Sequence, residues 1–105
     1  MATLIFEISW SPLIAAQLTS LLDNGIEQLA APGEEGAGRI TVSFESDPLV
    51  PHTIIWDLFS VGNKLTGLKA VAAWEHGIVQ PLDDADAATN RWQGHAIVRR
   101  KKVAP

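Results

Sequence analysis

The sequence predicts an α+β domain, in which an antiparallel sheet of four to five strands carries one or two helices on one face. Residues 3–10 and 39–45 alternate apolar and polar side chains with the period of a strand. Residues 12–31 place Leu and Ile at the spacings of an amphipathic helix. The element order β-α-β-β-(α)-β matches the ferredoxin-like topology, and the alternative is a β-meander with a single packed helix.

Length and composition predict one domain over residues 1–105, with a short basic C-terminal end at residues 99–105. The 105 residues include 30 Leu, Ile, Val and Phe, enough for a real hydrophobic core. There is no cysteine, so disulfides, thiolate metal sites and cysteine nucleophiles are excluded.

The charges are separated along the chain. Residues 1–90 carry all 12 acidic residues and only three basic ones, whereas residues 91–105 carry five basic residues and no acid. An acidic body with a basic end can pair with itself, with a neighbouring subunit or with a polyanion.

The N-terminus lacks the features of a secretion signal, because it has no basic region before its apolar residues and contains Glu7. No apolar run approaches the roughly 20 residues of a membrane-spanning helix. We therefore expect a cytoplasmic protein that does not bind a membrane.

The first half of the chain predicts a strand, a helix and a second strand. The strand at 3–10 ends at Ser11-Pro12, a favourable helix start. The helix at 12–31 contains Asn24-Gly25, where it either continues or breaks and restarts. Continuation is favoured because the spacing of Leu22 and Ile26 is kept across the glycine. Residues 32–38 are a loop by composition, and residues 39–45 are the second strand.

Residues 53–61 predict the central strand, because β-branched and aromatic side chains occupy both of its faces. One face would be covered by a helix and the other by a second helix or a partner chain.

Residues 64–76 fit two structures almost equally. Asn63 as a cap, an alanine-rich middle and Gly77 as a stop favour a helix. Alternation at Leu68, Ala70, Ala72 and Trp74 favours a strand instead. The helix is preferred narrowly. Residues 83–90 then predict an acidic loop or short helical turn, and residues 92–103 a last strand.

The candidate catalytic residues are Asp57, His76 and His95. Asp57 interrupts an apolar strand, and a buried carboxylate needs a partner or becomes an acid–base group. The chain also holds His52, but the spacing of the three histidines places no two of them as local metal ligands. No metal and no cofactor are expected.

The candidate binding residues are aromatic or basic: Trp56, Trp74, Trp92, Arg99 and Arg100. Two or three of the tryptophans fill a core, and any exposed one marks a partner surface. The basic end could contact phosphates, although the acidic body and the absence of a nucleic-acid-binding motif disfavour that partner.

These observations predict a small non-enzymatic protein-interaction or assembly module that self-associates as a homo-oligomer or binds another protein. The chain has more large apolar residues than one layered domain needs. The first alternative is a small cofactor-independent enzyme with an apolar pocket and His and Asp as acid–base residues. The second alternative is nucleic-acid binding through the basic C-terminal end.

Overall fold

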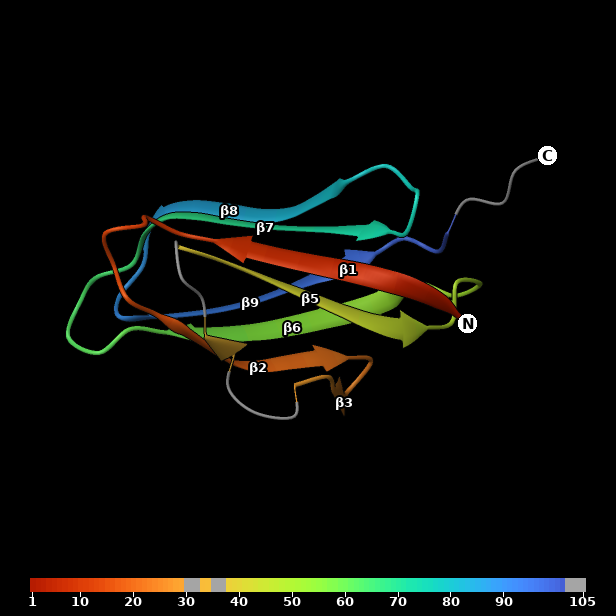
Figure 1. Ribbon diagram of the computed structural model, residues 1–105, viewed down its shortest axis with the longest axis horizontal. Helices are drawn as coiled ribbons and strands as arrows, with labels where there is room; N and C mark the ends of the chain where they lie inside the picture. Colours follow the sequence, from red (N-terminus) through yellow and green to blue (C-terminus); the bar gives the residue numbers. More distant parts are fainter. Residues whose placement is uncertain (30–32, 35–37, 102–105) are drawn as a thin grey trace.

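In the computed structural model the chain folds into two antiparallel sheets packed face to face (Figure 1). The structure describes residues 1–29, 33–34 and 38–101. The strands in chain order are β1 (Ala2–Ser9), β2 (Gln17–Asp23), β3 (Ile26–Glu27), β4 (Gly33–Glu34), β5 (Arg39–Ser46), β6 (His52–Phe59), β7 (Thr66–Trp74), β8 (Gln80–Ala87) and β9 (Arg91–Val98).

Sheet A has the strand order β5-β1-β7-β8, and sheet B has the order β3-β2-β6-β9 with β4 also paired to β2. Most consecutive strands lie in different sheets, so the chain crosses repeatedly from one layer to the other (Figure 1). The buried side chains of both sheets form one core between them. This architecture is a β-sandwich.

The predicted α+β fold is wrong, in both its ferredoxin-like and its meander form, because none of the described residues is helical. The predicted strands at 3–10, 39–45, 53–61 and 92–103 are present as β1, β5, β6 and β9. The central place of β6 is also confirmed, since it lies between β2 and β9. Parts of the predicted loop at 32–38 and of the basic end, namely residues 32, 35–37 and 102–105, lie outside the described residues.

The helix predicted at 12–31 is replaced by β2 and a tight hairpin turn. A register shift between Leu18 and Ser20 inserts an extra residue, so Leu18 and Leu21 both face the core although they are three residues apart. That spacing resembles a helical one. Asn24 and Gly25 have φ of 48° and 84°, the backbone of a two-residue hairpin turn.

The helix predicted at 64–76 is replaced by β7, and the acidic loop predicted at 83–90 mostly by β8. Within β7, Leu68, Ala70, Ala72 and Trp74 are buried on one face. Alanine favours a helix by only a few tenths of a kcal/mol per residue. Pairing with β1 on one side and β8 on the other outweighs that preference.

The centre of the core is the indole ring of Trp56 on β6, which is fully buried. Its ring centroid lies 5.7 Å from that of Phe6 in sheet A and 5.4 Å from that of Trp92 on β9. Gly94, opposite Trp56 on β9, leaves the space for the indole, because a Cβ built there would lie 2.2 Å from the ring. One aromatic ring therefore joins both sheets.

Candidate functional site

The three predicted catalytic residues do not converge. Asp57 and His95 lie on the outer face of sheet B, where Asp57 pairs in register with Gln93 and His95 with Ile55. His76 lies in the turn between β7 and β8, and its side chain is 90% exposed. A catalytic role for these residues stays a prediction that this geometry does not support.

Asp57 is held by a neighbouring cation. Its Oδ1 lies 3.2 Å from Nε of Arg91 on β9, although the N–H direction misses that of a hydrogen bond. The Arg91 guanidinium also lies over the ring of Phe59, 5.6 Å from its centroid. A half-exposed ion pair of this kind neutralises the carboxylate and contributes little stability.

The three tryptophans predicted to bind a partner are all buried in the core. Trp74 additionally donates its indole N–H to the backbone carbonyl of Arg99, 2.8 Å away, which fixes the end of β9. Arg99 and Arg100 themselves are exposed just beyond β9. The aromatic surface of this chain therefore serves packing, and the basic side chains point to solvent.

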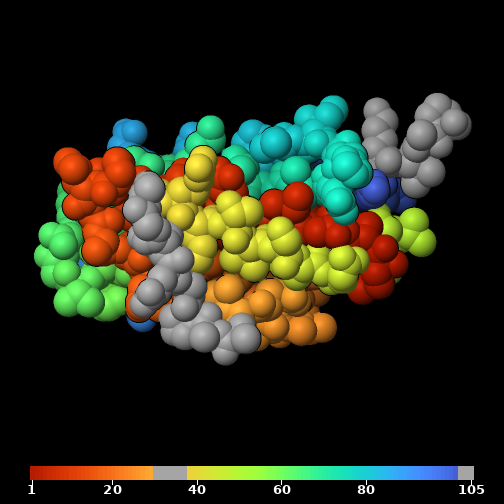
Figure 2. Space-filling view, in the orientation of Figure 1, coloured from red at the N-terminus to blue at the C-terminus, as the bar shows by residue number. Residues whose placement is uncertain are grey.

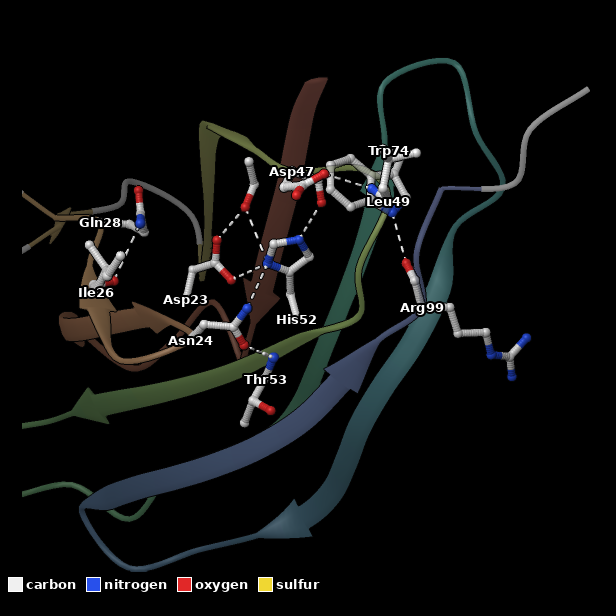
Figure 3. Close-up of polar contacts among 11 residues, drawn as sticks. Asp23, Asn24, Ile26, Gln28, Asp47, Leu49, His52, Thr53, Trp74 and Arg99 are labelled. Atoms are coloured by element: carbon white, nitrogen blue, oxygen red, sulfur yellow. Dashed lines mark hydrogen bonds and ion pairs between the residues drawn. The ribbon is translucent and has the colours of Figure 1, made fainter. Parts of the chain in front are cut away.

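A buried polar cluster lies at the end of the sandwich, where the turns after β2 and β5 lie (Figure 3). Asp23 is the last residue of β2, Ser46 the last of β5 and His52 the first of β6. All three are at most 5% exposed. Because β5 belongs to sheet A and β2 and β6 to sheet B, the cluster links the two sheets through polar contacts.

The imidazole of His52 meets hydrogen-bond acceptors at both ring nitrogens. Its Nε2 faces the backbone carbonyl of Asp47, and its Nδ1 lies 2.7 Å from Oδ1 of Asp23. The Ser46 hydroxyl donates to the other carboxylate oxygen of Asp23. The imidazole is therefore in polar contact at both ring nitrogens, and the Asp23 carboxylate is bound by both the ring and the Ser46 hydroxyl.

Two further residues surround the Asp23–His52 contact. The amide nitrogen of Asn24 lies 3.2 Å from Nδ1 of His52, and the amide oxygen of Asn24 accepts the backbone N–H of Thr53 at 2.8 Å. The edge of the His52 ring packs against Trp74, with 5.6 Å between ring centroids. The pair is therefore held by both polar and aromatic neighbours.

Serine, histidine and aspartate together suggest a hydrolase triad, but the geometry excludes that chemistry. In a triad the serine and the carboxylate bind opposite ring nitrogens. Here the Ser46 hydroxyl and the Asp23 carboxylate both lie beside Nδ1 of His52, at 3.2 Å and 2.7 Å, and the backbone carbonyl of Asp47 lies beside Nε2. The hydroxyl is also buried. The cluster is a structural link between the sheets.

Sequence reasoning missed this cluster because it placed Asp23 in a helix. The available signal was that Asp23, Ser46 and His52 each occupy a core-facing position at the end of a strand. Three polar residues on apolar faces predict a shared buried network. This inference requires β2 to be recognised as a strand, and its apolar spacing resembles that of a helix.

A second polar anchor holds β3 against β2. The Glu27 carboxylate accepts hydrogen bonds from the backbone N–H groups of Leu21 and Leu29 and from the Ser20 hydroxyl. Partial burial acts to raise the pKa of Glu27, but hydrogen bonds from Leu21, Ser20, Leu29 and Gln28 outweigh it, and the pKa is lowered.

We expect Glu27→Gln to lower the free energy of unfolding by less than about 1 kcal/mol at neutral pH, because the site is largely exposed. A lowered folded-state pKa means that the stabilisation is complete above the unfolded-state pKa. It is lost as the pH falls through the folded-state pKa of Glu27. In urea unfolding, the difference in free energy of unfolding between wild type and Glu27→Gln should therefore be smaller at acidic pH than at neutral pH. Glu7→Gln is the control, and an equal difference at every pH would contradict this account.

The described part of the chain holds no group of His, Asp or Glu side chains arranged to bind a metal ion. An open groove follows β7 and β8, lined by Gly67, Lys69, Asp84 and Asp86 among others. None of the three predicted catalytic residues lines it. Over the described ranges, no helix is both long and apolar enough to cross a membrane.

No family model, no curated protein and no solved structure matches this chain.

Proposed function

We propose that this chain is a small non-enzymatic assembly module of the cytoplasm that associates with further copies of itself. The observation that carries the proposal is the set of apolar side chains that the sandwich leaves uncovered. On the outer face of sheet B, Ile55 and Ile97 are 41% and 62% exposed. They lie on adjacent strands, diagonally across the register that pairs Ile55 with His95 and Thr53 with Ile97.

A second uncovered apolar region follows the edge of sheet A. Ile40, Val42 and Phe44 on β5 pack against the core but remain partly exposed. A folded monomer gains by covering such side chains with a partner surface. The absence of cysteine agrees with the proposed cytoplasmic location.

The enzyme alternative gains no support because His76 lies in the turn between β7 and β8, apart from Asp57 and His95 on the outer face of sheet B, and none of the three lines the groove along β7 and β8. Catalysis by proton transfer needs groups within hydrogen-bonding reach of one substrate. Asp57 is already paired with Arg91, and His76 has only Glu75 as an ionic neighbour, in an exposed turn. Assembly needs no such convergence.

We expect the wild-type chain to dimerise reversibly at micromolar concentration, because a contact through a few partly exposed apolar side chains would be a small interface. Sedimentation velocity over roughly 1 to 200 µM should show the mass rising from 11.3 kDa toward twice that value. One species of 11.3 kDa at every concentration would refute self-association.

A further inference from the structure

The strand β5 is a long, regular edge of sheet A. In Figure 2 it forms the yellow band along the visible face. It pairs with β1 over eight residues without a register shift, and no described strand pairs with its other edge. It contains neither proline nor lysine. An edge of this kind is ready to accept another strand.

The other edges are each covered or interrupted. The outer edge of β2 pairs with β3 and β4. On β8, Pro81, a register shift and three aspartates oppose pairing. The end of β9 is bridged by the Gln80 side chain, which bonds the Ile97 carbonyl and the Arg99 N–H. The proline, the register shift and the side-chain bridge at the other edges favour β5 as the contact edge.

We infer that two copies of the chain pair antiparallel through β5, joining their A sheets into one continuous sheet. The inference rests on the proposed self-association and names its surface and its register. Residues directly opposite in an antiparallel pair lie on the same face of the sheet. On β5 the residues with even numbers face the core and those with odd numbers face outward, so only registers that match even with even are allowed.

One allowed register satisfies both faces of β5. With Val42 opposite the partner's Val42, Ile40 meets the partner's Phe44, and the partly exposed apolar side chains cover one another. On the outer face, Arg39 meets the partner's Glu45, and the two-fold axis repeats that pair. The strand is therefore complementary to itself in charge as well as in apolar content.

Neighbouring registers lose this match. A shift of two residues in one direction places Arg39 opposite the partner's Ser43, and a shift in the other direction leaves Arg39 beyond the paired segment. In the monomer, no described carboxylate forms an ion pair with Arg39. Glu45 accepts one bond, from the Thr3 hydroxyl to Oε1 at 2.7 Å, so Oε2 is available to a guanidinium. Charge thus selects the register centred on Val42.

Charge reversal tests the outer-face pairs. Arg39→Glu places two carboxylates opposite each other at both ends of the contact, and we expect the dimer dissociation constant to rise about tenfold. Glu45→Arg should weaken the dimer similarly. The double variant should have a dimer dissociation constant within about threefold of the wild-type value, because the two ion pairs re-form with the charges exchanged. Both positions are exposed, and circular dichroism will check that each variant keeps its fold.

Single cysteines read the register directly, because the chain has no cysteine of its own. Residues directly opposite each other have Cα atoms roughly 4.5–5.5 Å apart, close enough for a disulfide. Residues diagonal to each other are too far apart to form one. Of Thr41→Cys, Val42→Cys and Ser43→Cys, we expect only Val42→Cys to form a disulfide dimer under mild oxidation. Faster dimer formation at position 41 or 43 would overturn the register.

The rival surface is the outer face of sheet B, tested by Ile97→Thr. We expect this variant to dimerise like wild type. If Ile97→Thr abolishes the dimer while Arg39→Glu leaves it intact, the β5 contact is refuted and self-association stands. A strictly monomeric wild-type chain refutes both.

Discussion

Replacing His52 by alanine should remove about 3–5 kcal/mol from the free energy of unfolding, a large share of the stability of a domain this size. The substitution removes the imidazole partner of the Asp23 carboxylate, whose side chain is only 7% exposed. It also leaves the Asp47 carbonyl without its donor. Equilibrium unfolding in urea, followed by tryptophan fluorescence, measures the loss.

His95→Ala is the matched control, because His95 is an exposed histidine on a strand of the same sheet. We expect it to change stability by less than about 0.5 kcal/mol. Asp23→Ala should cost about as much as His52→Ala, and the double variant less than the sum, by roughly 1–3 kcal/mol. Additive losses would mean that the two residues are not coupled, and a stabilising Asp23–His52 contact would then be rejected.

Gly94→Ala should cost about 3 kcal/mol, the upper range for an overpacked core. The new Cβ would lie 2.2 Å from one ring atom and 2.7 Å from Nε1 of Trp56, so either the ring or β9 must move. The ring has little room, because Trp92 and Phe6 pack beside it. Thermal unfolding by near-ultraviolet circular dichroism would report both the loss of stability and the displaced indole.

Gln93→Ala is the control for Gly94→Ala, since Gln93 is the exposed neighbour on β9. Trp56→Phe combined with Gly94→Ala should cost less than the sum of the single changes, because the smaller ring leaves room for the methyl group. The indole Nε1 has no hydrogen-bond partner among the described residues, so phenylalanine sacrifices no such bond there. A full additive loss would show that Gly94 is required for another reason.

The proposed β5 contact also depends on the buried cluster. Ser46, whose hydroxyl binds Asp23, is the last residue of β5 and anchors that strand to sheet B. Glu45, which the dimer register places opposite the partner's Arg39, directly precedes it. The same polar link that joins the sheets therefore holds the end of the open edge in place.

The sequence pattern locates a strand wherever apolar and polar residues alternate regularly. It placed β1, β5 and β6 close to their observed bounds and began β9 within one residue, but it extended β9 to residue 103 although the strand ends at Val98. The apolar character of both faces of residues 53–61 indicated the central strand. The lack of cysteine excluded thiol chemistry outright. These inferences depend on periodicity and on composition, which are local properties of the chain.

The choice between helix and strand for β2 and β7 depended on tertiary pairing, and the same packing brought Asp23, Ser46 and His52 together. The bulge after Leu18 gave β2 a helix-like spacing, and the alanines of β7 suit a helix as well as a covered strand face. Pairing partners that are distant in sequence settled both cases. The same holds for the open edge of β5, because the simple alternation of residues 39–45 fits a central strand as well as an edge strand.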